Sequence, residues 1–259
     1  MLKSHFRITF FKFISGNTII FGWTRASPIF VLAGESIKAF TPQLMKFYIL
    51  KTASGTEETG MEYPQAGMKP DYDFKALDSI WNVDSLSFPN FEPNLTYLDM
   101  VPGAKLSDFI STPVTHGFVV SPKVKDILSE FKLVPHKFHS AIVKHQGDFY
   151  NYFWLHTLSD LTDYIDFQKT KFFVDYFNKK ENEFGVESKE DLKKMIKHYI
   201  LQNRFIKTEQ LFLSPRFYDL MLDLFIISGF DHRTYINETL RNRLLKQKVT
   251  GIEITEYLA

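Results

Sequence analysis

The sequence predicts an α+β fold, in which a mixed, mainly antiparallel sheet has a few amphipathic helices packed on it. Aromatic residues make up 16% of the chain, including 27 Phe and 12 Tyr, and such side chains favour strands. Helical and extended patterns follow one another without the regular strand–helix alternation that builds a parallel sheet. With 259 residues, of which 44% are hydrophobic, the chain is long enough to bury a sizeable core.

The clearest local pattern is a strand, a helix and a second strand within Gly117–Val143. Ser121 occupies the position of a helix N-cap, and Pro122 follows at the first helical residue, where its missing N–H costs nothing. Pro135 prevents the helix from continuing, and strand-like alternation resumes over Lys137–Val143. Apolar residues at helical spacing predict one buried face, formed by Val124, Ile127, Leu128 and Phe131.

Two further helices have recognisable starts. Ser188 precedes a helix predicted from about Lys189 to Asn203, and Asp191 completes a near match to a capping box. Asn237 caps a helix predicted over Glu238–Gln247, and its leucines recur on one face. Both helices are therefore expected to pack one face against the sheet.

Strands are predicted where β-branched and aromatic residues gather between turn residues. Phe149–Leu155 is the most aromatic of these stretches and is expected near the centre of a sheet. Thr52–Tyr72 is polar and rich in Gly and Pro, which predicts a surface loop, and the charged stretch Lys179–Glu187 predicts a turn. The other predicted strands are Lys46–Lys51, Tyr164–Phe167, Lys171–Phe177, Leu211–Ser214, Leu224–Ile227 and Ile252–Ile254, with short strands and irregular chain over Asp73–Leu98 and a short helix or turn at Pro215–Leu222.

Residues 1–44 differ from the rest in composition, so we divide the chain into an N-terminal extension, 1–44, and a single α+β domain, 45–259. The extension carries five basic residues and one acidic residue, a net charge of +4. A membrane span needs about 20 apolar residues, and Lys12 and Arg25 leave too few between them. Two interpretations stay open: a weak secretory signal, and a native translation start at Met45.

Composition excludes several classes of site. The chain has no cysteine, which excludes disulfides, thiolate metal sites and a cysteine nucleophile. Residues 45–259 carry the remaining 26 basic and 29 acidic residues, a net charge of −3, so nucleic acid is not expected as the main partner. No serine-nucleophile elbow and no complete phosphate-loop motif occurs. We expect no cofactor.

Two clusters of polar residues could carry chemistry. Three histidines fall close together: His136, His139 and His145. The first two lie on opposite faces of a strand, which disfavours a shared metal ion. Three aspartates recur at every third position: Asp160, Asp163 and Asp166. They lack the alternate ligands and the glycine of a calcium loop, so capping of turns after the aromatic strand is the simpler interpretation.

Four parts of the chain share their pattern with one known family. They are Val119–Phe131, then Phe149–Tyr152 with Asp163–Asp166, then Tyr218–Phe225, and last Tyr235–Leu240 with Val249–Glu253. In these parts, between roughly Met45 and Glu253, the chain resembles the immunity protein 11 family of bacterial polymorphic-toxin systems. Asn237 stands where the family more often has serine, which is a conservative exchange for a helix cap.

The resemblance implies a cytoplasmic, non-enzymatic protein that binds and neutralises a cognate toxin domain, without a small-molecule ligand or a membrane partner. It brings no catalytic residues to this chain. The candidate toxin contacts are the Thr52–Tyr72 loop and the acidic side chains Asp160, Asp163 and Asp166. The mildly acidic domain is compatible with a basic toxin.

Two alternative functions remain open. The first is a hydrolase-like enzyme with carboxylates and histidines assembled in space. It would be favoured by a pocket in which two of the following converge: His136, His139, His145, Asp163 and Asp166. The second is a nucleic-acid-binding module that uses the basic outer side of the helical region Ser188–Lys207.

Overall fold

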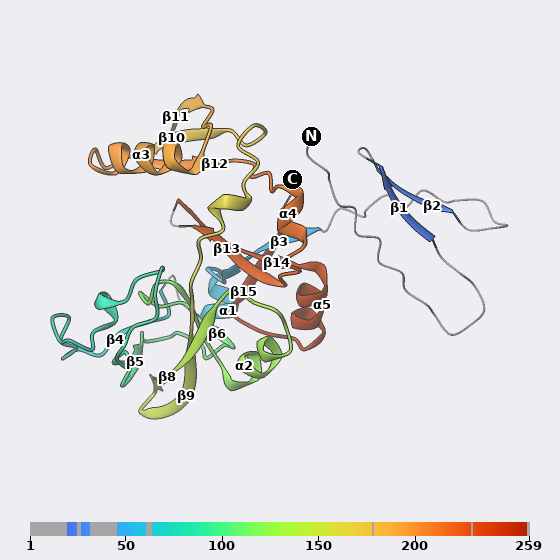
Figure 1. Ribbon diagram of the computed structural model, residues 1–259. Coiled ribbons are helices and arrows are strands. Elements are labelled where there is room, and N and C mark those ends of the chain that lie inside the picture. Colours follow the sequence, from blue (N-terminus) through green and yellow to red (C-terminus); the bar gives the residue numbers. More distant parts are fainter. Residues whose placement is uncertain are drawn as a thin grey trace, which may run out of the picture. The chain divides into compact units, whose positions relative to one another are not determined.

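The computed structural model describes residues 20–24, 27–31, 46–60, 64–177, 179–228 and 230–257. The chain divides into two compact units, Met1–Leu44 and Met45–Ala259 (Figure 1). In the first unit, β1 (Ile20–Thr24) and β2 (Ser27–Val31) pair as an antiparallel hairpin. The predicted secretory signal or late start concerns residues that lie mostly outside the described ones. No helix in the described part of the chain is long and apolar enough to cross a membrane.

A four-stranded antiparallel sheet joins the beginning and the end of the second unit. Its order is β13 (Leu224–Ser228), β14 (Asp231–Asn237), β3 (Phe47–Thr52) and β15 (Ile252–Tyr257). The strands predicted at 46–51, 224–227 and 252–254 are confirmed by β3, β13 and β15. Both faces of β3 are covered, because its successive side chains enter two different hydrophobic clusters.

A six-stranded sheet contains the aromatic strand at its centre. Its order is β4 (Ala66–Met68), β5 (Leu98–Met100), β8 (His136–His145), β9 (Asp148–Thr157), β7 (Gly117–Val120) and β6 (Phe109–Ile110). The β5–β8 pair is parallel and the other pairs are antiparallel. The predicted mixed, mainly antiparallel α+β fold is therefore confirmed.

A three-stranded antiparallel sheet completes the unit, in the order β11 (Lys179–Phe184), β10 (Phe172–Tyr176) and β12 (Phe205–Thr208). Helix α3 (Lys189–Ile200) buries Leu192 in the same cluster as Phe172 and Ile206 of this sheet. The other helices are α1 (Thr56–Thr59), α2 (Pro122–Ser129), α4 (Pro215–Tyr218) and α5 (Glu238–Lys246), with 3-10 turns at Ile80–Asn82 and Thr162–Tyr164.

Several local predictions were wrong where tertiary contacts decide the structure. The predicted surface loop 52–72 contains α1 and β4, and Gln65 and Ala66 are fully buried. The buried Gln65 amide is satisfied by hydrogen bonds to Ser107 and Ser111. The predicted turn 179–187 contains the exposed edge strand β11. The strands predicted at 164–167 and 211–214 reduce to one isolated bridge, Ile165–Leu213.

The helix α2 begins as the sequence predicts. The Ser121 hydroxyl accepts a hydrogen bond from Val124 N at 3.4 Å, and Pro122 is the first helical residue. Val124, Ile127 and Leu128 are buried. The same hydroxyl donates to the Asp108 carboxylate at 2.8 Å, so the cap also ties the helix to the chain before β6.

Removing this cap is expected to destabilise the fold. Ser121→Ala should lower the free energy of unfolding by about 1 kcal/mol, because the first turn of α2 loses its side-chain acceptor. Urea denaturation measures the change. Ser129→Ala, at the exposed end of the same helix, is the matched control and should change stability by less than about 0.5 kcal/mol. Equal effects of the two variants would contradict the capping role.

Two aspartates join parts of the chain that are far apart in the sequence. Asp223, just before β13, accepts hydrogen bonds from Lys132 N and from the Asn237 amide. Asp108 accepts from Ser121 and from Thr250 N at 3.0 Å. Burial opposes ionisation of Asp108, but these bonds and Lys123 outweigh it and lower its pKa. These bonds thus connect the two ends of α2 to the chain before β13, the cap of α5 and the turn before β15.

Candidate functional site

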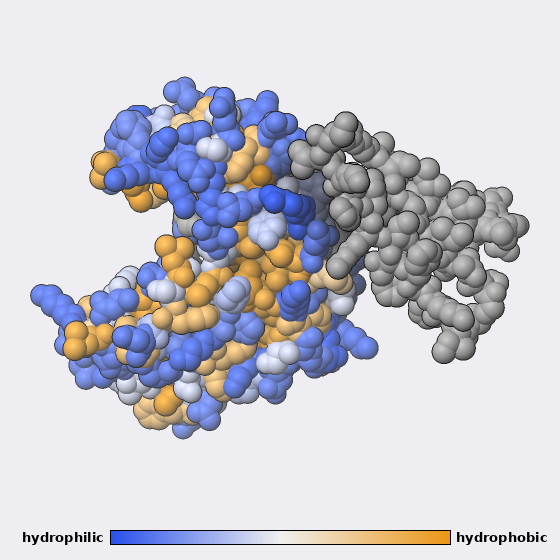
Figure 2. All heavy atoms as spheres, viewed as in Figure 1, coloured by the Kyte–Doolittle hydropathy of each residue, from blue (hydrophilic) through white to orange (hydrophobic). Residues whose placement is uncertain are grey.

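A cleft of about 770 Å³ opens where the three sheets of the second unit approach one another. The space-filling view is hollowed beside the part of the chain that carries α3 (Figure 2). The cleft is lined from β3, β13, β14, β10, β12, the start of β7 and the end of β9. Its volume falls in the range of small-molecule sites. We refer to it as the central cleft.

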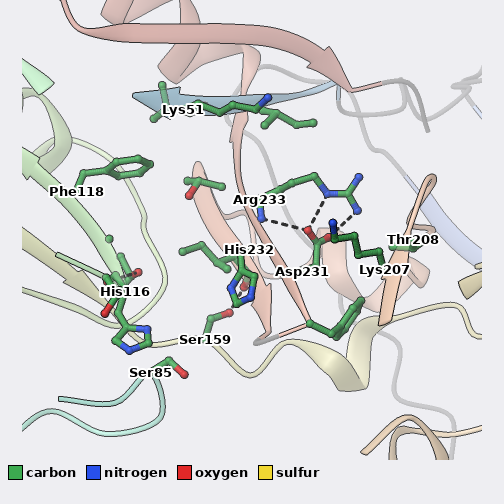
Figure 3. A pocket seen from close by; sticks show the side chains of 18 of the residues that line it. Lys51, Ser85, His116, Phe118, Ser159, Lys207, Thr208, Asp231, His232 and Arg233 are labelled. Carbon is green, nitrogen blue, oxygen red and sulfur yellow. Dashed lines mark hydrogen bonds and ion pairs between the residues drawn. The ribbon is translucent and has the colours of Figure 1, made fainter. Parts of the chain in front are cut away.

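A closed ion-pair network fills one side of the central cleft (Figure 3). The Asp231 carboxylate, almost fully buried, accepts two hydrogen bonds from the Arg233 guanidinium, at 2.7 and 2.8 Å. It also accepts the Tyr235 hydroxyl at 2.7 Å. Burial opposes the charge of Arg233, but Asp231 outweighs this effect and raises the pKa of Arg233. The network is satisfied internally and leaves little charge for a ligand.

Two other formal charges on the wall of the cleft are also paired. Lys207 forms an ion pair with Asp175 at 3.1 Å, and Glu209 accepts from Lys180 at 2.9 Å. The exposed Lys51 lies opposite Glu253 in the β3–β15 ladder. The side of the cleft formed by β10, β12 and β14 is therefore close to electrically neutral.

Two imidazoles face the cleft, and neither ring makes a hydrogen bond to the described residues. Figure 3 shows His232 beside Ser159, with His116 across the opening near Ser85. His116 has a φ of 58°, a left-handed conformation uncommon for a non-glycine residue. Burial lowers the pKa of His116, while the nearby Asp84 opposes the change. These two histidines are therefore the candidate acid–base groups of the cleft.

None of the residues proposed from the sequence for an enzymatic pocket lines the central cleft. His136 contacts the carbonyl of Val134 at 3.0 Å, and His139 is fully buried in the six-stranded sheet. His116 and His232 were not predicted as site residues, because His116 precedes β7, His232 lies near the start of β14, and neither has a recognisable motif around it. Among the described residues, no group of three potential metal ligands comes together.

Two of the three aspartates proposed as toxin contacts are brought together by a lysine. Lys189, at the start of α3, bonds Asp160 at 3.0 Å and Asp163 at 2.8 Å. Asp163 and then Asp160 raise the pKa of Lys189, and Lys189 lowers the pKa of Asp160 against the opposing effect of burial. Asp166 is separate and pairs with Lys169 at 3.3 Å. The first two carboxylates thus hold α3 in place.

Three aromatic rings stack in the interior of the six-stranded sheet. Trp154 lies 4.7 Å from His156 and 5.2 Å from His139, centroid to centroid, and all three side chains are buried. His139 Nδ1 bonds Glu92 at 3.0 Å, and His156 Nε2 bonds the carbonyl of Asp84 at 3.0 Å. The second nitrogen of each imidazole has no partner in the described structure. We call these rings the histidine–tryptophan stack.

The chain that covers this stack is Asp71–Thr96, which we call the aromatic segment. It exposes five large apolar side chains, all within 15 residues: Phe74, Leu77, Trp81, Leu86 and Phe88. Its underside is buried through Tyr72, Ile80, Val83 and Leu95. Ring contacts link Tyr72 to Phe74 at 5.2 Å and Phe74 to Trp81 at 6.1 Å.

Hydrogen bonds fix the conformation of the aromatic segment. The Tyr72 hydroxyl accepts from Ile80 N at 2.8 Å, and the Asn82 amide donates to the carbonyl of Ala76 at 2.9 Å. Asp84 accepts from the backbone N–H groups of Leu86 and Ser87, each at 2.7 Å, and these bonds lower its pKa. The exposed rings are therefore held on a well-defined backbone.

Compared with known proteins, the chain matches no family model and no curated protein sequence.

Proposed function

We propose that this protein is a non-enzymatic immunity protein, acting in the cytoplasm, which binds a cognate bacterial toxin domain and blocks its active site. The proposal rests on the resemblance to the immunity protein 11 family. The observation that carries it is the aromatic segment, whose exposed side chains stand on a backbone fixed by hydrogen bonds.

The composition of this surface suits a protein partner. Trp81 is 52% exposed and Leu77 is 90% exposed, so both would lose much contact with water in a complex. Tryptophan and tyrosine dominate the binding energy of protein interfaces when a partner buries them. Ordered aromatic side chains also lose little conformational entropy on binding. The aromatic segment thus replaces the 52–72 loop and the lysine-bound aspartates as the proposed contact surface.

The test is binding of the toxin domain encoded beside the gene of this protein, measured by calorimetry. We expect nanomolar one-to-one binding with loss of toxin activity. Trp81→Ala should weaken binding by about 2 kcal/mol, roughly 30-fold in Kd. Phe205→Ala is the matched control, because Phe205 on β12 is also 52% exposed and should leave Kd unchanged. Equal loss in both variants, or no binding by the unmodified protein, would contradict the proposal.

A second candidate function is a hydrolase-like activity in the central cleft. Two imidazoles that line the cleft, those of His116 and His232, favour it, since histidine is the side chain that most often serves as a general base. Hydrolysis of ester substrates that disappears in both His116→Gln and His232→Gln would support this function. Residual hydrolysis that neither variant changes would exclude these histidines from it.

A further inference from the structure

The acidic charge of the second unit is concentrated on the aromatic segment. Residues 71–96 contain five acidic residues and one lysine, a net charge of −4. Residues 45–259 together carry a net charge of −3, so the rest of this unit has a net charge of +1. The exposed apolar side chains and the acidic excess therefore share one segment of chain.

Three of these carboxylates are not neutralised by the protein itself. Asp71 pairs with Lys69, and Glu92 pairs with Lys137. The other three have no ion pair among the described residues: Asp73, Asp78 and Asp84. Hydrogen bonds from Leu86 N and Ser87 N favour the ionised form of Asp84, and Asp73 accepts from Lys75 N at 2.9 Å. Three carboxylates without an ion pair therefore lie close in sequence to the exposed aromatic rings.

We infer that the partner of the aromatic segment is a protein surface that presents arginine or lysine side chains around an apolar centre. The inference rests on the proposed function and specifies the chemistry of its partner. A cationic side chain gains from the face of an exposed Trp or Phe and from a carboxylate beside it. The exposed Phe74 and Trp81, close in sequence to Asp73 and Asp78, provide both types of group.

The sign of the charge argues against other occupants. Nucleic acids and anionic lipid surfaces carry negative charge and would be repelled by this segment. A second copy that docks through the same segment would bring like charges together, which costs free energy. Apolar contact alone would fit many surfaces, whereas the combination with three unpaired carboxylates selects a basic one.

The decisive measurement is the association rate of the full chain with the neighbouring toxin domain, at 50 and 500 mM salt. The triple variant Asp73→Asn, Asp78→Asn, Asp84→Asn keeps the side-chain acceptors but removes the charges. We expect it to associate about 10-fold more slowly at low salt, with the difference lost at high salt. The control triple variant is Asp148→Asn, Glu190→Gln, Asp219→Asn, which removes three exposed charges elsewhere. Equal slowing by both triple variants would overturn the inference.

A second measurement separates this inference from the proposed function. The probes are two peptides of alternating residues, one of arginine and leucine and one of glutamate and leucine. The arginine peptide should quench the fluorescence of Trp81, as assigned with Trp81→Phe, and the glutamate peptide should not. Quenching without toxin binding would refute the immunity function and keep the inference. Toxin binding without salt dependence would support the immunity function and refute the inference. Salt-dependent self-association of the chain would also refute it, by identifying a second copy as the occupant.

Discussion

Replacing Asp231 by asparagine is expected to lower the free energy of unfolding by about 3 kcal/mol. The substitution leaves the guanidinium of Arg233, which is only 24% exposed, without its anionic partner. The Tyr235 hydroxyl, which is buried, loses its charged acceptor as well. Breaking a buried pair from one side costs more than the pair contributes, because an uncompensated charge remains. Urea denaturation at pH 7 measures the loss.

The double variant Asp231→Asn, Arg233→Met tests this explanation. Removing both partners also removes the uncompensated charge, so it should recover part of the stability lost in Asp231→Asn. The Arg233 guanidinium also lies 5.5 Å from the ring centroid of Tyr257, and methionine preserves much of that packing. If the double variant loses as much stability as Asp231→Asn and Arg233→Met lose in sum, the two residues act independently and the explanation is wrong.

The second large effect expected is a loss of stability between pH 6.5 and pH 4. Burial lowers the pKa of His156 from 6.5 to about 4, and burial also lowers that of His139. The unfolded chain binds these protons below about pH 6.5, whereas the folded chain excludes them until lower pH. Stability therefore falls as the pH falls through this window. For His156 alone the loss amounts to about 3 kcal/mol at pH 4.

The histidine that causes this loss can be identified by substitution. His156→Gln retains a donor for the carbonyl of Asp84 but cannot be protonated in this range, so its unfolding free energy should depend less on pH between 6.5 and 4.5. His232→Gln, at an exposed position, should behave as the unmodified protein. The lowered pKa values of Asp84 and Glu92 also make the folded state less stable as the pH falls, but only below the ordinary values of these groups, 3.8 and 4.5. Identical pH profiles for His156→Gln and the unmodified protein would refute this assignment.

Acid should loosen the aromatic segment before the rest of the fold. Both histidines of the stack are bonded to this segment, through Glu92 and the carbonyl of Asp84. Hydrogen exchange at pH 5 should therefore accelerate in residues 71–96 more than in α2 or β9. Uniform acceleration over all these elements would indicate global destabilisation instead.

The sequence predicted the elements whose signals are local. The cap and proline before α2, the cap before α3 and the aromatic strand β9 are each recognisable within a few residues, and all three are confirmed. The helix predicted to end near Asn203 ends at Ile200 instead, because a left-handed residue at Asn203 closes the turn there. Local propensity therefore places such elements well, although their ends shift by a few residues.

The candidate sites depend on contacts that no local pattern encodes. Lys189 lies 29 residues from Asp160, and His139 lies 47 residues from Glu92. Apolar residues in the irregular stretch after Asp73 would ordinarily be assigned to the core, so the exposure of Leu77 and Trp81 could not be predicted. That acidic residues and exposed rings share this segment can be recognised only when the structure shows which of its side chains are buried.

The strand β3 has a consequence for biosynthesis. It pairs on one side with β14 and on the other with β15, where Phe47 lies opposite Tyr257, 210 residues later. At synthesis rates of about 5–20 residues per second, β3 waits roughly 10–40 seconds before its last neighbour is translated. The four-stranded sheet can therefore be completed only after most of the chain has been synthesised. Until then the aromatic side chains of β3 lack part of their native packing.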